Sequence, residues 1–299
     1  MVNLNFLDQM IVWVMECVTT TSFSISLNGR LNGFFKGRKR LRQGDPLSPL
    51  LFVICLEYLS RLLKSLEGKF RFKFHPKCKE LKITHLVFAD DLMLFSNGIK
   101  EGKFPFKYLG IPLLASKLNV VHYRPLVDRI AGWFKGWPSN NLTYAGRLEI
   151  IKSIVQGFEC FWLAIFPIPL NVLNHIIKLC RAFLWGGRRK PLGAWSEVCK
   201  PKDEGGLGVF DLKTWNRALL TKALWNIQAK KDSLWTKWIH QCYLKDTGIW
   251  YAATKKKDSS LFKRLVDIKD QLVQKARSVA AAIEKMQRMG NESYMFYEF

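Results

Sequence analysis

Two adjacent aspartates, Asp90 and Asp91, interrupt the otherwise apolar stretch "HLVFADDLMLF" of residues 85–95. Burying unpaired carboxylates costs several kcal/mol, so we expect the pair at a hairpin tip, where it protrudes while both strands stay covered. Carboxylate oxygens are ligands that Mg²⁺ prefers, and two Mg²⁺ ions can activate a 3′-hydroxyl group and stabilise a leaving pyrophosphate. The alternative is a surface turn, in which aspartate is common. Taken alone, the pair favours that alternative.

Two further motifs accompany the aspartate pair. "RQGDPLSP" lies upstream at residues 42–49, and "FKYLGIPL" lies downstream at residues 106–113. Ser48 followed by Pro49 is a favourable start for a helix, which we expect to run from about Pro49 to Leu66. Its apolar positions go most of the way round the helix, which predicts a buried element.

In this order the three motifs resemble successive motifs of reverse transcriptases, most strongly those of non-LTR (LINE-type) retrotransposons of plants. The resemblance extends through residues 195–225 and covers most of residues 10–250. It implies RNA-templated DNA synthesis with Mg²⁺ and deoxynucleoside triphosphates, on an RNA template with a DNA primer or on their hybrid. It also implies an α+β fold, in which a partial polymerase palm of β-hairpins and a buried helix precedes an all-α thumb and a helical C-terminal extension.

The resemblance also assigns roles to single residues of this chain. Asp90 would be a direct catalytic metal ligand, and Asp91 would support the metals or the primer terminus. The remaining assignments concern the nucleotide and template pocket, the primer grip and the nucleic-acid backbone. They are Gln43, Gly44, Pro46, Phe88 and Ala89 for the pocket, Tyr108, Leu109 and Gly110 for the primer grip, and Arg38, Lys39, Arg40 and Arg42 for the backbone. For the basic run a solvated hairpin is an equal alternative.

The sequence departs from the family pattern in two places. The family's palm begins with a strand that carries another catalytic aspartate well upstream of "GDPLSP", and this chain starts too late to contain it or the fingers. Only residues 96–107 separate the "FADD" motif from "YLG", where the family has a helix and a strand. We therefore expect a truncated, internally deleted fragment that binds Mg²⁺ weakly and is catalytically incomplete on its own.

Charge and composition point to a polyanionic partner. The 299 residues include 47 basic and 24 acidic side chains, which gives a net charge of +23, and 48% of the residues are hydrophobic. Nucleic acid is the usual partner of such a chain, with an anionic membrane surface as the rival. Most of the tryptophans occupy apolar helix faces, which favours core packing. Trp185 and Trp195 flank a basic, glycine-rich stretch and are the best candidates for stacking on bases.

Cysteine usage and hydropathy indicate the compartment. The seven cysteines show no C-x-x-C spacing, which predicts reduced thiols without zinc in an intracellular protein, nuclear or cytoplasmic. No secretion signal is visible. The most apolar segment, residues 158–170, contains Glu159 and two prolines and is too short to span a bilayer, so we expect no membrane association.

Local patterns predict the remaining elements. Residues 22–27 alternate polar and apolar side chains and precede Asn28-Gly29, which predicts a hairpin. Asp211 is expected to cap a helix that runs through Gln228. The apolar stripe of residues 261–286 predicts an amphipathic helix that packs on its own chain. Apolar side chains at helical spacing predict three further helices, over residues 122–136, 145–165 and 170–184.

These elements suggest five segments. They are the partial palm at 1–98, the primer-grip connection at 99–121, the thumb at 122–187, the C-terminal extension at 188–258 and an amphipathic tail at 259–299. Three functions stay open: a reverse transcriptase fragment, a non-catalytic basic nucleic-acid-binding protein, and a degenerate retrotransposon reading frame without a selected function. The sequence does not indicate the oligomeric state.

Overall fold

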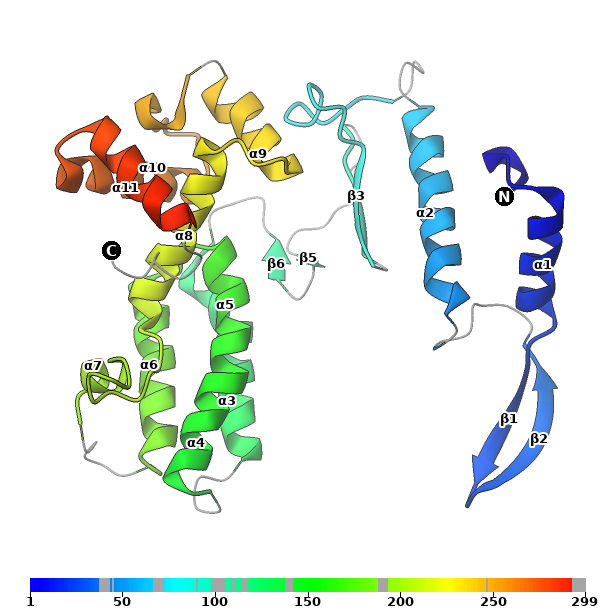
Figure 1. The fold of residues 1–299 in the computed structure, drawn as a ribbon, viewed down its shortest axis with the longest axis horizontal. Coiled ribbons are helices and arrows are strands. Elements are labelled where there is room, and N and C mark those ends of the chain that lie inside the picture. Colours follow the sequence, from blue (N-terminus) through cyan, green and yellow to red (C-terminus); the bar gives the residue numbers. More distant parts are fainter. Residues whose placement is uncertain are drawn as a thin grey trace. The chain divides into compact units, whose positions relative to one another are not determined.

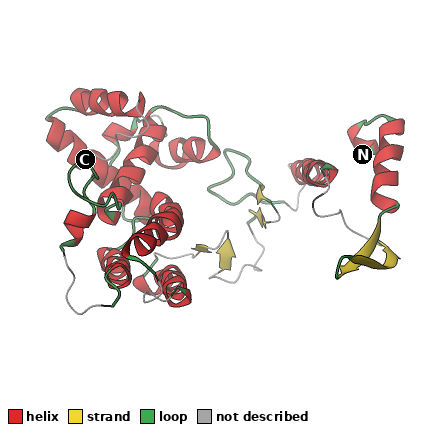
Figure 2. Ribbon diagram, turned by 60° about the horizontal axis from the view of Figure 1, so that its bottom comes forward, coloured by secondary structure: helices red, strands yellow, loops and turns green. Residues whose placement is uncertain are grey.

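The computed structural model describes most of the chain in two compact units, residues 1–99 and residues 100–299 (Figure 1). The described residues are 1–37, 44, 46–66, 72–89, 91–97, 106–108, 111–113, 118–137, 142–187, 193–245 and 247–291. Short antiparallel strand pairs and many helices make up its regular structure, as an α+β class requires (Figure 2). The five-segment division and its boundaries stay predictions.

The first unit combines two long helices with two hairpins. Its elements are η1 (Val2–Leu4), α1 (Asp8–Thr19), β1 (Ser22–Leu27), β2 (Arg30–Lys36), α2 (Leu47–Lys64), β3 (His85–Phe88) and β4 (Asp91–Leu94). Each described sheet of the unit has two antiparallel strands, β1 with β2 and β3 with β4. A two-stranded sheet is marginal in water by itself.

The β1–β2 hairpin follows the turn chemistry of its sequence. Leu27 pairs with Arg30, and the two residues between them, Asn28 and Gly29, both have positive φ angles, of 51° and 79°. This is the conformation that Asn-Gly favours in two-residue hairpin turns. The second Asn-Gly, Asn32-Gly33, has another role. The strand register shifts between Ser24 and Ile25, and the unpaired residue opposite this shift is Gly33, whose φ is 68°. Gly33 therefore supplies the extra residue of a β-bulge.

Helix α2 corrects one expectation. It spans Leu47–Lys64, with Pro46 rather than Ser48 at its N-cap, and none of its side chains is buried. Leu50 is 62% exposed and Val53 is 60% exposed. The prediction of a buried helix was therefore wrong for the described residues. Its apolar circumference has the composition of a core helix, but the described elements of this unit form only two-stranded sheets, and these do not surround it.

Helices make up nearly all the regular structure of the second unit (Figure 2). One short hairpin, β5 (Phe106–Tyr108) with β6 (Ile111–Leu113), precedes them. The helical elements are η2 (Val120–Tyr123), α3 (Arg124–Gly136), α4 (Tyr144–Ile150), η4 (Ile151–Val155), α5 (Gln156–Ile165), α6 (Leu170–Leu184), α7 (Trp195–Val198), α8 (Leu212–Gln228), α9 (Leu234–Ile239), η5 (His240–Leu244), η6 (Ile249–Tyr251), α10 (Ser260–Ala276) and α11 (Val279–Asn291). The expected bounds of α6 and α8 are confirmed, and the Asp211 carboxylate caps α8 by accepting from the Thr214 amide at 3.0 Å.

The unit has two hydrophobic cores. The first is built mainly on α3, α5 and α6, with Leu126, Trp162 and Ile176 at its centre. The second is built on α8, α10 and the segments between them, with Leu224 and Leu265 fully buried. Helix α8 contributes to both cores, as its path through the unit in Figure 1 allows.

Asn216, in the second turn of α8, ties this helix to α5. The Asn216 side chain is 7% exposed, and its amide nitrogen donates to the carbonyl oxygens of Leu163 at 2.6 Å and Phe166 at 2.9 Å. Leu163 lies in the last turn of α5, and the residue four positions later is Pro167, which has no N–H group to donate. The asparagine thus satisfies backbone acceptors that the helix itself leaves open.

Two predicted helices contain interruptions. The expected helix 145–165 is divided by the π-helical segment η4, beside which the Ser153 hydroxyl donates to the Glu149 carbonyl at 2.6 Å. Serine that bonds back to the preceding turn commonly distorts helices. The expected 261–286 helix is two helices, because Arg277 has a φ of 63° and the Ser278 hydroxyl accepts from the Ala281 amide to begin α11. Both pack on their own chain, as expected.

Replacing Gly157 by alanine is expected to stabilise the protein. Gly157 lies in α5, and an added Cβ would meet nothing within 4 Å. Alanine is favoured over glycine in a helix by about 1 kcal/mol. Urea unfolding followed by circular dichroism should show a higher midpoint with an unchanged slope. An unchanged or lower midpoint would contradict the open surroundings of this position.

Among the described residues, none of the helices combines the length and the apolar composition that crossing a bilayer requires.

Candidate functional site

Asp91 begins the second strand of a tight hairpin. Strands β3 and β4 pair antiparallel, with Phe88 opposite Asp91 and His85 opposite Leu94. Only Ala89 and Asp90 separate the closing pair, and Ala89 has a φ of 49°, in the left-handed region that alanine rarely adopts. Asp90 itself lies outside the described residues. Asp91 is half-buried at the first position of β4, and Phe88 beside it is 61% exposed.

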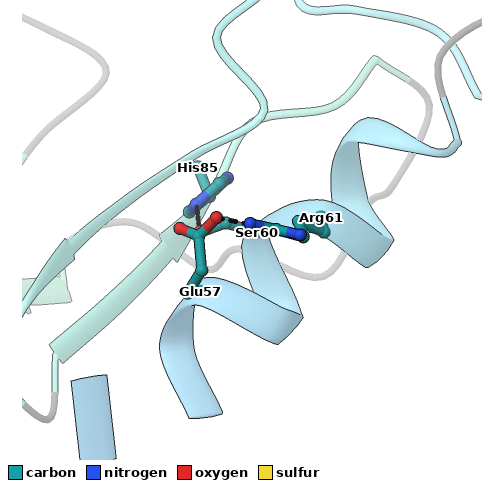
Figure 3. A network of polar contacts seen from close by, with 4 residues as sticks. All are labelled: Glu57, Ser60, Arg61 and His85. Atoms are coloured by element: carbon teal, nitrogen blue, oxygen red, sulfur yellow. Dashed lines mark hydrogen bonds and ion pairs between the residues drawn. The ribbon is translucent and has the colours of Figure 1, made fainter. Parts of the chain in front are cut away.

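The two faces of this hairpin have different neighbours. Because side chains alternate along a strand and paired residues share a face, Asp91 lies on the same face as Phe88 and Met93. His85 lies on the opposite face with Leu94. His85 contacts Ser60 of helix α2 (Figure 3), so this contact lies on the face of the hairpin opposite to Asp91.

A hydrogen-bonded histidine fixes the hairpin to α2. His85 Nε2 lies 2.8 Å from the Ser60 hydroxyl (Figure 3). Its Nδ1 lies 2.8 Å from the hydroxyl of the buried Thr84. A neutral imidazole has one donor and one acceptor nitrogen, and each hydroxyl can take the complementary role. Both ring nitrogens are therefore satisfied, as in a histidine with a structural role. Sequence reasoning missed the role of Ser60. The only sequence feature that could have indicated it is a small polar residue within an apolar helix.

One ion pair lies beside this contact on the exposed surface of α2. Arg61 Nε donates to Glu57 Oε1 at 2.9 Å (Figure 3). This hydrogen bond, together with the positive charges of Arg61 and Lys64, lowers the pKa of the Glu57 carboxyl below its usual value. Glu57 therefore stays ionised at neutral pH.

The chemistry of the hairpin tip fits a magnesium ligand. Mg²⁺ is commonly held by one or two carboxylates together with substrate phosphates and water. Asp91 supplies one such carboxylate, and Asp90 precedes it in the sequence. Within the described ranges, no group of three or more His, Cys, Asp or Glu residues is placed to hold a metal ion.

The other predicted pocket residues are placed in part. Gly44 has a φ of 89°, which favours glycine, and the exposed Pro46 is the N-cap of α2. Phe88 and Ala89 lie beside Asp91, at the tip of the β3–β4 hairpin. Gln43 and the basic residues predicted to meet the nucleic-acid backbone, Arg38, Lys39, Arg40 and Arg42, lie outside the described residues.

Of the predicted primer-grip residues, the structure describes Tyr108, which ends strand β5 in the second unit. Tyr108 is half-buried and pairs with the buried Ile111, so only Leu109 and Gly110 separate the strands β5 and β6. Both of these residues lie outside the described residues. The "YLG" motif therefore ends one strand and begins a two-residue hairpin connection.

Comparison with known proteins agrees with the three motifs. Residues 2–120 match the family model described as reverse transcriptase (RNA-dependent DNA polymerase). Among curated proteins, 137 residues are 34% identical to a protein of Arabidopsis thaliana named "Putative ribonuclease H protein", a match that covers 44% of this chain. A further 66 residues, 22% of this chain, are 41% identical to an uncharacterized mitochondrial protein of the same plant.

An insect retrotransposon supplies the third relative. Over 91 residues, 30% of this chain, the sequence is 37% identical to the retrovirus-related Pol polyprotein from type-1 retrotransposable element R2 of Popillia japonica. The matched parts cover 22%, 54% and 14% of the lengths of these three relatives, in the order given. This chain therefore carries, in residues 2–120, a reverse transcriptase segment of the non-LTR type, which confirms the relationship that its motifs indicate.

Proposed function

We propose that the β3–β4 hairpin is the metal-binding hairpin of a two-metal nucleotidyl transferase, and that this chain binds an RNA template and a DNA primer. The observation that carries the proposal is the position of Asp91 at the closing pair of a two-residue turn, directly after Asp90. Bound Mg²⁺ would neutralise the phosphates of an incoming nucleotide and stabilise the leaving pyrophosphate. Asp90 and Asp91 would each offer it carboxylate oxygens.

The chain's own residues would hold this hairpin in place. The positive φ of Ala89 reverses the chain between the two strands, and the Ser60–His85 contact fixes the opposite face against α2. We propose that substrate approaches at the hairpin tip, where Phe88 beside Asp91 is 61% exposed. We further propose that Gly44, Pro46 and Gln43 contribute to the nucleotide pocket, and that Tyr108, Leu109 and Gly110 support the primer end.

We also propose that the 299-residue chain does not complete polymerisation when assayed alone. The two aspartates offer two negative charges against the four positive charges of two Mg²⁺ ions, and the resemblance implies a further aspartate that these residues do not supply. The short interval of residues 96–107, where the family has a helix and a strand, supports the same conclusion. A weak Mg²⁺ site and no processive synthesis are expected.

Asparagine at the aspartates is expected to abolish most of the magnesium affinity. Losing a carboxylate ligand should weaken Mg²⁺ binding in the presence of a deoxynucleoside triphosphate by about tenfold or more, as even outer-shell changes do at metal sites. Calorimetric titration of Asp91→Asn and Asp90→Asn measures this, and Asp8→Asn, an exposed acid of α1, is the matched control. Unchanged binding in both variants would overturn the metal site. Processive primer extension that Asp90→Ala abolishes would overturn the proposed incompleteness.

The net charge of +23 favours a second function, non-catalytic nucleic-acid binding. Neutralisation of phosphates by lysine and arginine makes affinity fall steeply with salt. This function predicts salt-dependent binding that the asparagine variants at Asp90 and Asp91 leave unchanged.

A further inference from the structure

Three helix ends meet at one end of the first core of the second unit. Phe134, in the last turn of α3, stacks on Phe183, in the last turn of α6, with ring centroids 4.3 Å apart and planes 11° apart. Tyr144, the first residue of α4, stacks on Trp185, the C-cap of α6, with centroids 5.4 Å apart. The aromatic pairs therefore bring the ends of α3 and α6 and the beginning of α4 together, at the lower end of the bundle in Figure 1.

The outer aromatic residues at this end are exposed. Phe183 is 5% exposed and belongs to the first core, and Trp185 packs against that core. Tyr144, which covers Trp185, is 37% exposed, and Trp137, the C-cap of α3, is 49% exposed. We call Trp137, Tyr144 and Trp185 the aromatic end. Tyr144 and Trp137 expose part of their rings to solvent, whereas Trp185 is half-buried beside Tyr144.

A guanidinium group lies beside the stacked pair. Gly186 follows Trp185 with a φ of 62°, and a Cβ added there would come within 2.4 Å of Arg147 Nη1. The glycine thus leaves the space that the Arg147 guanidinium uses. Burial raises the pKa of the Tyr144 hydroxyl and the nearby charge of Arg147 opposes it, with burial the larger effect. Lys135, exposed in the last turn of α3, adds a second cation near this end.

We propose that the aromatic end is a binding site for an unpaired nucleobase of a single-stranded nucleic acid, with Arg147 and Lys135 contacting its phosphates. Flat rings beside cations are the combination that binds single strands, since every base has a face to stack and every nucleotide carries a negative charge. The inference rests on the proposed function in that the chain binds nucleic acid, and it names a site that lies in the helical unit and needs no metal.

Alanine at Tyr144 or Trp137 is expected to weaken single-strand binding by the full-length chain about fivefold to a hundredfold. Fluorescence anisotropy with labelled oligouridylate and oligothymidylate of about 12 nucleotides measures the affinity and distinguishes RNA from DNA. Tyr144→Phe, which keeps the ring, should bind like the wild type. Tyr251→Ala is the matched control, because Tyr251 is 78% exposed elsewhere in the same unit.

An abasic oligonucleotide of the same length separates stacking from charge. It should bind the wild type and the Tyr144→Ala and Trp137→Ala variants equally, because it has no base to stack. An equal loss on abasic and normal strands would overturn the proposal, as would normal affinity of both alanine variants. Thermal unfolding by circular dichroism identifies a variant that fails to fold. In that case the binding measurements on the other alanine variant test the proposal.

The outcomes also separate this site from the metal-binding hairpin. Oligonucleotide binding is measured in magnesium-free buffer, so that a metal ion held by the hairpin does not contribute to it. If the alanine variants lose base-dependent binding but calorimetry finds no Mg²⁺ binding at the hairpin, only the proposed metal site is contradicted. If the hairpin binds Mg²⁺ but oligonucleotide affinity is the same in the Tyr144→Ala and Trp137→Ala variants as in the wild type, only this inference is contradicted.

Discussion

Asn216→Ala is expected to lower the free energy of unfolding of the second unit by about 3 kcal/mol. The substitution removes the amide that donates to the Leu163 and Phe166 carbonyl oxygens, at 2.6 and 2.9 Å. An acceptor left unpaired in a buried place costs about 1–3 kcal/mol, and two are involved. Pro167, four residues after Leu163, has no N–H group with which to replace the lost donor. Urea unfolding monitored by circular dichroism gives the value.

The control for this prediction lies on the same helix. Asn226 of α8 has a buried Oδ1 atom without a hydrogen-bond partner, so Asn226→Ala should change stability little. Asn216→Asp tests the chemistry further, since a carboxylate beside two carbonyl oxygens repels them and should destabilise at least as much as alanine at neutral pH. Equal effects at Asn216 and Asn226 would refute the special role of Asn216.

Gly206→Ala is expected to cost a similar amount, about 3 kcal/mol. A Cβ on Gly206 would lie 2.0 Å from the carbonyl oxygen of Lys200 and 2.4 Å from its carbonyl carbon. These are backbone atoms, so no change of rotamer relieves the collision. The loop is also fixed on both sides, because Gly206 donates to the Pro201 carbonyl at 2.9 Å and Leu207 donates to the Val198 carbonyl at 3.1 Å. The chain must shift, and with it Leu207, which packs on the first core.

Gly193→Ala provides the comparison, because an added Cβ there meets nothing within 4 Å and no positive φ requires glycine. Its unfolding midpoint should equal that of the wild type. A Gly206→Ala protein that is as stable as Gly193→Ala would show that the loop does not pass as close to Lys200 as the structure places it.

Sequence patterns predicted the helices of the second unit better than the packing of the first. The bounds of α6 and the Asp211 cap of α8 followed from apolar spacing and cap chemistry, which act within a few residues. The break at Arg277 was missed, because an arginine in the left-handed conformation carries no strong local signal. The burial of α2 was predicted wrongly, since burial depends on elements distant in sequence.

The candidate site shows the same division. The turn between β3 and β4 follows from two acids within an apolar run, but the expectation that both strands stay covered was wrong, because Leu92 is 43% and Leu94 55% exposed. The Ser60–His85 contact joins residues of α2 and β3 that no local pattern relates. Tyr144 likewise gains its partner only when the ends of α4 and α6 meet. Distant pairs of this kind depend on tertiary packing, which periodicity and turn chemistry do not describe.

Helix α8 has a consequence for how the second unit comes apart. Its early residues Leu212 and Trp215 belong to the first core, and its later residues Leu220 and Leu224 belong to the second. Withdrawal of this helix would hydrate both cores at once, so no route through α8 releases one and spares the other. Any opening of the unit that withdraws α8 therefore exposes the two cores together.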